Sequence, residues 1–564
     1  MYATNALTAF KLGISGAVLG GIGSALGWSG STSAGPRPVK VAQLGKIGSF
    51  LKQHDLLLPS LCAVALLLIT LGAAGIEQEI ANRINYLIYY HYEPGCCVGG
   101  LREAVAIARL GQGSHLLSHL IVFLCCLLFA LLVNWAINVN LFSLHGMYRM
   151  RLMRAFLGAS NMQQYPDLFT QFDPKDTPHE IELARDGGVP LHVINTTLNL
   201  VGTTNLAWRQ RKAAPFTFSP LHSGCWRLAY VPTQIYAGAD GVSVATAMAI
   251  SGAAFNPNMG YHSSPLVTLL MTFFNVRLGW WLPNPVREGG ARHALKSTKG
   301  ADFLHKTGPT IALEPLILEA LGMTDETYRW IELTDGGHFE NLGIYEMVLR
   351  RCRNIVVVDA GADPDCQFED LGNALRKIEI DLGIPIRFEQ GIEMKKGANP
   401  GNRYCAVAKI DYGCVDDNSK LPPAERKDLP GKLIYIKAAL TGNEPPDVKQ
   451  YAATHPTFPH EATANQFFNE SQFESYRHLG SYEIESIVTM RSAAKAAPTT
   501  ATELGVESQL LERNRHPGSY EIETILTQRP AAAPAVPADA TKIGVDLEGF
   551  AKAAEDYAKD VSAS

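Results

Sequence analysis

Two long uncharged stretches constrain the fold of this chain more than any other feature. Residues 56–76 carry no charge between Asp55 and Glu77, and residues 116–142 are also uncharged. A helix of about 20 apolar residues crosses the hydrocarbon core of a bilayer, so both stretches are predicted to be transmembrane helices. The alternative is a pair of buried core helices, but such helices rarely run this long without a polar face.

Basic residues on either side of the two stretches predict their orientation. Four precede the first stretch and three follow the second: Arg37, Lys40, Lys46, Lys52, Arg149, Arg151 and Arg154. Because basic flanks stay in the cytoplasm, we expect a helical hairpin with both ends inside and a cytoplasmic region after about residue 143. The intervening loop also contains three arginines, which oppose this prediction: Arg83, Arg102 and Arg109. They are mixed with glutamates, so the prediction stands.

The composition narrows the partners and cofactors. Charged residues make up 18% of the chain, a low share that agrees with membrane segments. The net charge of −5 gives no indication of nucleic-acid binding. The ten cysteines form no C-x-x-C pair and no Cys/His cluster, so we expect no zinc site.

The chain is expected to divide into six segments. These are a Gly-rich N-terminal segment (1–55), two transmembrane helices (56–76 and 116–142), the loop between them (77–115), an α/β region (143–480) and a tail (481–564). Near and within the tail, the sequence of residues 477–491 recurs with few changes at 515–529. The tail is rich in Ala and Pro, which predicts partial disorder. The repeat is either a docking motif or a duplication without function.

Strand-like and helix-like stretches alternate between residues 143 and 440. Strands are predicted at 191–198, 331–335, 354–361 and 432–440, and helices at 340–352 and 367–382. This alternation predicts an α/β fold, a sheet with flanking helices. The strand at 331–335, the helix at 340–352 and the strand at 354–359 are expected to form one right-handed β–α–β unit.

The segment LTDGGHFENLGIYE (333–346) is the most informative for chemistry. Asp335 ends a predicted strand, at the edge where ligands bind in α/β sheets. Gly336 and Gly337 can adopt positive φ and let the backbone approach a ligand closely. A carboxylate there can take a proton from a nucleophile or orient a histidine. The alternative is a structural carboxylate with a local partner such as His338 or Asn341.

A family resemblance rests on this segment and on several other blocks in the same order. The blocks are SLHGMYRMRLMRAFLGAS (143–160), PLHVINTTLNLV (190–201), FTFSPLHSG (216–224), AMAISGAAFNPNMGYHSSP (247–265), FNVRLGWWLPNP (274–285) and FPHEATANQFFNESQFESYRHLG (458–480). Together with LTDGGHFENLGIYEMVLRRCRNIVVVDAGADPD, they resemble the membrane-associated bacterial branch of the patatin-like phospholipases. The resemblance covers roughly residues 143–480.

The resemblance implies a patatin-like α/β fold and a function. In this family a Ser–Asp dyad hydrolyses a lipid ester: the serine attacks the carbonyl, the aspartate takes its proton, and a Gly-rich loop holds the oxyanion. Asp335 matches the family's catalytic aspartate. The chemistry needs no cofactor and no metal, the substrate is a membrane phospholipid or another acyl lipid, and the expected location is the bacterial inner membrane.

The serine of the dyad is not found, because no intact G-x-S-x-G occurs. Ser251 lies in AISGAA, but the following FNPNMG breaks a helix, and in the family this block lines the site without supplying the nucleophile. Ser15, Ser29 and the VGGLR loop (98–102) are interpreted as chance matches. The chain is therefore interpreted as the C-terminal part of a longer enzyme, with the serine on an upstream polypeptide.

The remaining candidates are interpreted as structural. Asp359 also ends a predicted strand, but an aspartate before Ala-Gly is usually a turn former. His222 and His262 are more often satisfied structural histidines than catalytic ones. Trp280 and Trp281 are membrane-interface anchors or core residues. Two functions are therefore compared: a membrane-anchored lipid acyl hydrolase with Asp335 as general base, and an inactive membrane remnant or pseudoenzyme that binds lipid or a partner.

Overall fold

The computed structural model describes most of the chain between residues 57 and 495. The described residues are 57–92, 101–159, 161–168, 170–184, 190–286, 302–388, 390–416, 431–462, 469–495, 552, 554 and 555. They form two compact units, divided between Glu346 and Met347. The protein is a mixed α/β molecule with a sheet in each unit.

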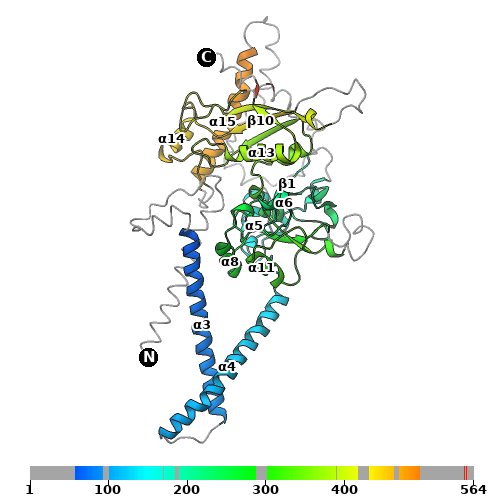
Figure 1. The fold of residues 1–564 in the computed structure, drawn as a ribbon. Helices are drawn as coiled ribbons and strands as arrows, with labels where there is room; N and C mark the ends of the chain where they lie inside the picture. The colour runs from blue at the N-terminus through cyan, green and yellow to red at the C-terminus, as the bar shows by residue number, and fades with distance from the viewer. Residues whose placement is uncertain are drawn as a thin grey trace. The chain divides into compact units, whose positions relative to one another are not determined.

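Two long helices begin the described chain. Helix α3 spans Leu57–Tyr92 and α4 spans Leu101–Ala136, and the two helices contact one another (Figure 1). Within the described residues, the segment Leu117–Ala136 of α4 is long and apolar enough to cross a membrane. The other predicted span, 56–76, coincides with the first part of α3, and many of its side chains lie outside the described part of the chain. Both helices extend into the region predicted as a loop.

The first unit contains a six-stranded sheet in the order β4-β3-β2-β1-β6-β5. Its strands are β1 (Ile194–Asn199), β2 (Ala213–Phe218), β3 (His222–Cys225), β4 (Ala229–Pro232), β5 (Trp280–Pro283) and β6 (Trp330–Asp335). Every neighbouring pair is antiparallel. All the residues of β5 are buried, and all those of β6 before Asp335, which is why both read as apolar runs rather than as alternating strands.

Helices cover this sheet and complete the core of the first unit. They are α5 (His145–Leu152), α6 (Leu206–Arg209), α7 (Val244–Ser251), α8 (Pro265–Phe273) and α11 (Leu313–Ala320). Helix α7 contacts β1, β6 and α5. Ser243 caps its N-terminus by accepting a hydrogen bond from the Thr246 main-chain N–H, and Gly252 ends it. Because α7 is almost entirely buried, it fixes the surroundings of the carboxyl end of β6.

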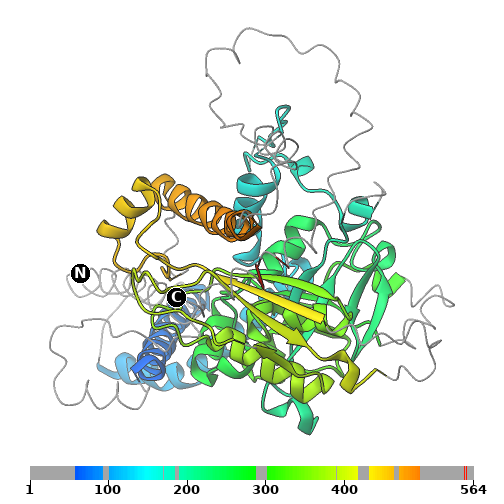
Figure 2. The same cartoon turned by 90° about the horizontal axis from the view of Figure 1, so that it is seen from above.

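The second unit contains a four-stranded sheet in the order β7-β10-β9-β8. Its elements are β7 (Asn354–Asp359), α13 (Glu369–Leu382), β8 (Ile386–Phe388), β9 (Cys405–Ile410), β10 (Gly431–Lys437), α14 (Pro446–Thr454) and α15 (Glu470–Lys495). Strands β7 and β10 are parallel, and the other pairs are antiparallel. Ile487 of α15 packs against Ile434 and Ile436 of β10, and Figure 2 shows the orange α15 next to the yellow strands.

The predicted strands and helices are present, but one predicted connection is wrong. The strand at 331–335 is β6 and the strand at 354–359 is β7, yet they belong to different sheets and do not form a β–α–β unit. The helix between them, α12 (Ile344–Leu349), is only 6 residues long, shorter than the predicted 340–352. Both edges of β6 are already paired, with β1 and with β5, so β7 cannot join it. Helix α15 also continues without a break across residue 480, where the tail was expected to begin.

Candidate active site

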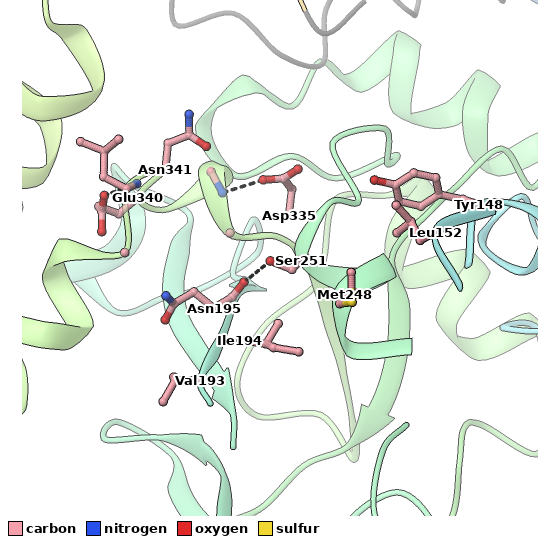
Figure 3. Close-up of a pocket in the computed structure, with 14 residues that line it drawn as sticks. Tyr148, Leu152, Val193, Ile194, Asn195, Met248, Ser251, Asp335, Glu340 and Asn341 are labelled. Atoms are coloured by element: carbon pink, nitrogen blue, oxygen red, sulfur yellow. Dashed lines mark hydrogen bonds between the residues drawn. The ribbon is translucent and has the colours of Figure 1, made fainter. Parts of the chain in front are cut away.

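A pocket of about 440 Å³ lies beside the carboxyl end of β6 in the first unit (Figure 3). Its lining comes from α5, the start of β1, the end of α7 and the segment that follows β6. The lining residues are Tyr148, Leu152, Val193, Ile194, Asn195, Met248, Ser251, Asp335, Gly336, Gly337, Glu340, Asn341, Leu342 and Gly343. The pocket therefore contains Asp335, the residue singled out by sequence, together with Ser251.

The last residue of β6 is Asp335, which pairs with Thr196 in the antiparallel register of β1. Its Oδ1 accepts a hydrogen bond of 2.6 Å from the Gly337 main-chain N–H. This bond caps the short 3₁₀ turn Gly336–His338. The carboxylate thus has a structural role at the turn as well as a position on the pocket wall, and its other oxygen, Oδ2, is not held by the turn.

Burial raises the pKa of the Asp335 carboxyl from an ordinary value of 3.8 to about 7. The hydrogen bond from Gly337 acts in the opposite direction, because it stabilises the ionised form. A carboxylate with a pKa near neutrality is poised to take up and release a proton at physiological pH. That property distinguishes Asp335 from an ordinary surface aspartate and suits a general base.

The two glycines after Asp335 are needed for space and not for positive φ. Neither lies in the left-handed region of backbone conformation, which corrects the expectation from sequence. A Cβ on Gly336 would lie 2.9 Å from the main-chain oxygen of Asn195, and one on Gly337 would lie 2.8 Å from Asn341 Oδ1. Gly-Gly therefore lets the turn approach β1 closely.

Thr197 fastens this turn to β1. Its hydroxyl donates to the Gly336 main-chain oxygen at 3.1 Å and accepts from the Phe339 main-chain N–H at 3.1 Å. His338 is buried, and its Nδ1 bonds to the Thr334 hydroxyl at 2.9 Å. Burial lowers the pKa of His338 to about 3, so the ring is neutral at physiological pH and acts as a structural group.

Ser251 is brought into the pocket but is not arranged as a nucleophile. It is the last residue of α7, whereas a nucleophile elbow lies between the end of a strand and the start of a helix. Its hydroxyl donates a hydrogen bond of 2.7 Å to the main-chain oxygen of Asn195, as Figure 3 shows. The position agrees with the expectation that this block lines the site.

Tyr148 on α5 is a pocket residue that the sequence reasoning did not single out. Figure 3 shows its ring on the same side of the pocket as Asp335. Burial raises the pKa of the Tyr148 hydroxyl, and the nearby charge of Asp335 raises it further. A Cβ on Gly252 would lie 2.4 Å from this hydroxyl, so the glycine after α7 makes room for it. Tyr148 and Gly252 lie within two of the blocks that carry the family resemblance, and the sequence offered no other indication that they belong to a site.

The rest of the lining mixes apolar and polar side chains. Leu152, Ile194 and Met248 contribute aliphatic side chains on the side of the pocket away from Glu340 (Figure 3). Glu340 is a local cap, since its two oxygens accept hydrogen bonds from the main-chain N–H groups of Leu342 and Tyr345. The pocket thus combines the Asp335 carboxylate and other polar groups with these aliphatic side chains.

The other sequence candidates lie elsewhere. Asp359 is buried in the second unit, where its Oδ2 pairs with Lys437 Nζ at 3.0 Å and accepts from the Tyr435 hydroxyl. Its Oδ1 accepts from the Gly361 main-chain N–H at 2.8 Å, so Asp359 is a turn former, as expected. The two histidines and two tryptophans singled out by sequence also lie outside the pocket. His222 and His262 are exposed, and Trp280 and Trp281 are buried core residues.

The remaining sequence candidates cannot be placed in the structure. Ser15, Ser29 and the first part of the VGGLR loop lie outside the described residues. Among the described residues, no three His, Cys, Asp or Glu side chains gather in a group that could hold a metal ion.

A scan of protein-family models gives no match for this chain, and a search of the curated proteins gives none either.

Proposed function

We propose that the chain carries the aspartate half of a membrane-anchored lipid acyl hydrolase of the patatin-like type. The observation that supports this most is Asp335: a carboxylate with a pKa near 7, on the wall of a pocket that also contains aliphatic side chains. In the proposed reaction, Asp335 takes the proton of a serine hydroxyl as that oxygen attacks the ester carbonyl, and later returns it to the leaving alcohol.

The attacking serine comes from outside this pocket in the proposal. Ser251 is unsuitable, because it ends a helix and its hydroxyl bonds to a main-chain oxygen. An upstream polypeptide with a G-x-S-x-G elbow would supply the nucleophile, and its Gly-rich loop would supply the oxyanion donors. The substrate class is a membrane phospholipid or another acyl lipid, and the soluble units lie on the cytoplasmic side of the bacterial inner membrane.

The test is ester hydrolysis by the chain expressed together with the segment encoded directly upstream of it. Asp335→Asn should abolish turnover of phosphatidylcholine and of short acyl esters, because loss of a catalytic base costs about 10²–10⁴ in rate. The matched control is Asp325→Asn, which changes a carboxylate of the first unit that also accepts a hydrogen bond from a main-chain N–H two residues on and should keep full activity. Retained activity in Asp335→Asn would show that Asp335 is not the base.

One observation favours a second candidate, a lipid-binding protein without catalysis. Ser251 is the serine that lines the pocket, and its hydroxyl donates to the main-chain oxygen of Asn195 and not to Asp335. Binding of a fluorescent fatty acid to the chain would support this candidate if Met248→Trp, which fills the pocket, abolishes that binding. Absence of hydrolysis in the chain with its upstream segment would then decide for it.

A further inference from the structure

Helix α8 presents large apolar side chains on its outer side. The helix, PLVTLLMTF, contains no charged residue. Its inner side is buried through Val267, Leu270 and Met271, while Leu266, Leu269 and Phe273 are exposed at a spacing of three and four residues. Phe273 has 63% of its surface exposed. A helix that is apolar all round belongs in a protein core or in a membrane.

Helix α11 continues this apolar surface. Leu313, Ile317 and Leu321 follow one another at intervals of four residues and are all exposed, Leu321 at 65%. Helices α8 and α11 contact one another, and Figure 1 shows them side by side. We call the outward side chains of these two helices the α8–α11 face: Leu266, Leu269, Phe273, Leu313, Ile317 and Leu321.

The α8–α11 face gathers exposed apolar side chains on two helices in contact, whereas an ordinary soluble surface carries them singly. Six large side chains on two touching helices form a patch, and such patches mark contact with a membrane, a ligand or another protein. Apolar surface left in water is unfavourable, so a covering partner is favoured. The neighbouring elements indicate which partner it is.

Hydrogen bonds fasten the end of the membrane-spanning segment to this face. Asn134, close to the end of the segment Leu117–Ala136, accepts a hydrogen bond of 2.6 Å from the Leu313 main-chain N–H at the start of α11. The Asn275 side-chain amide, just after α8, donates to the main-chain oxygen of Phe142. A helix that crosses the bilayer ends at the headgroups, so the end of α8 and the start of α11 are fastened near that level.

The chain that links α4 to the first unit is itself apolar and exposed. Leu141 and Phe142 follow the spanning segment, and Phe142 has 68% of its surface exposed. The side chain of Asn140 holds this link to the unit, because it donates to the Trp281 main-chain oxygen and accepts from the Trp281 main-chain N–H. Exposed apolar side chains therefore follow the spanning segment directly, and the Phe142 main chain is bonded to Asn275 at the end of α8.

We propose that the α8–α11 face is a second membrane contact, which lies in the bilayer surface beside the spanning segment of α4. The occupant is lipid, because this face is fastened to a segment that is long and apolar enough to cross the membrane. Amphipathic surface helices bury apolar side chains in the region between headgroups and acyl chains. The first unit is then held flat on the membrane at two places and not by a single flexible tether. This proposal does not depend on ester hydrolysis by Asp335.

The experiment uses the full chain reconstituted into phosphatidylcholine vesicles. A hydrophobic diazirine that partitions into the bilayer is photoactivated, and labelled residues are located by mass spectrometry of peptides. We expect peptides that contain 266–274 and 313–321 to be labelled to an extent similar to the segment 117–136. The controls are Leu206, which is 83% exposed on α6, and Leu168, which is 94% exposed; both should carry several-fold less label.

Two outcomes would overturn the proposal. If α8 and α11 carry no more label than Leu206 and Leu168, the face is in water and lipid does not cover it. If both helices are protected and native mass spectrometry of single lipid nanodiscs shows two copies of the chain, a second copy covers the face. Label at α8 and α11 in nanodiscs with one copy supports the membrane contact.

Discussion

Ser251 and Asp335 line the same pocket, yet the Ser251 hydroxyl donates its hydrogen bond to the main-chain oxygen of Asn195, 2.7 Å away, and not to the carboxylate. Asn195 belongs to β1, which is also the strand that pairs with the end of β6. Ser251 therefore ties α7 to the sheet beside the candidate base. The arrangement gives the serine a structural role that requires no reaction.

The first prediction follows from this bond. The purified chain should not hydrolyse short acyl esters, and Ser251→Ala should not change that. The substitution should lower the free energy of unfolding by about 0.5–1.5 kcal/mol, because the partly buried carbonyl of Asn195 loses a donor. Denaturant unfolding monitored by tryptophan fluorescence measures this. Turnover by the purified chain that disappears in Ser251→Ala would make Ser251 the nucleophile.

The second prediction concerns pH and the Asp335 carboxyl. Its folded-state pKa of about 7 exceeds the ordinary value of 3.8, so the folded protein binds more protons than the unfolded chain between these values. Stability is therefore lost as pH rises from about 4 to 7, and no further loss occurs above that range. Asp335→Asn removes the ionisation and with it this loss. The free energy of unfolding of the variant, relative to that of the parent protein, should therefore rise by about 1–3 kcal/mol between pH 5 and pH 8.

A suitable control for this pH effect is Asp325→Asn. Asp325 accepts from the Thr327 main-chain N–H at 2.7 Å, the same capping geometry that Asp335 has with Gly337. Thermal unfolding of both variants and the parent protein at the two pH values separates burial of a carboxyl from loss of a turn cap. If the effect of Asp335→Asn is the same at pH 5 and pH 8, Asp335 is not protonated by burial.

Features of the fold that depend on neighbouring residues could be predicted from the sequence, and pairings between distant strands could not. The strand ending at Asp335 was predictable, because an apolar run stops at a carboxylate and two glycines. Its partner was not: β6 pairs with β1, over 130 residues earlier, and with β5, and an apolar run contains no record of its neighbours. The β–α–β interpretation failed for the same reason.

The pocket was predictable only in part. Asp335 was found from its position at a strand end, and Ser251 from its short motif. Tyr148 and Asn195 contribute to the site through α5 and β1, which come from distant parts of the sequence, so no spacing rule connects them to Asp335. The sequence predicted that Gly336 allows a positive φ. The structure shows instead that glycine is needed because the Asn195 main chain comes close, a contact that only the tertiary structure contains.

The third prediction tests that close approach. A Cβ at Gly336 would lie 2.9 Å from the Asn195 main-chain oxygen, which cannot move without shifting β1. Gly336→Ala should therefore destabilise the first unit by about 1–3 kcal/mol, the usual cost of overpacking. At Gly337 the nearest atom is the side-chain oxygen of Asn341, which can rotate away, so Gly337→Ala should cost less. Equal losses in the two variants would show that β1 yields.

The fourth prediction is the topology of the membrane hairpin. Reporter domains fused after residues 95 and 300 should lie on opposite sides of the membrane, with the second in the cytoplasm, because basic residues flank the two predicted spans. A phosphatase active only outside the cytoplasm and a fluorescent protein that folds only inside it give complementary readings. The same side for both fusions would exclude a hairpin.

The last prediction concerns the buried ion pair of Lys437 and Asp359 in the second unit. Their atoms Nζ and Oδ2 are 3.0 Å apart, both side chains are almost fully buried, and the residues face each other in the parallel register of β7 and β10. Lys437→Met leaves Asp359 in the core with its hydrogen-bond donors but without a counter-charge. Removing one partner of a buried pair costs about 3–5 kcal/mol.

Hydrogen exchange of the full chain measures this cost locally, through peptides that cover β7 and β10. A loss of about 3–5 kcal/mol should accelerate exchange there by roughly 10²–10⁴. The double variant Asp359→Leu with Lys437→Met should recover most of the protection, because replacing a buried pair by apolar residues is often neutral. If the double variant exchanges as fast as Lys437→Met alone, the carboxylate itself, through the donors Tyr435 and Gly361, holds the two parallel strands together.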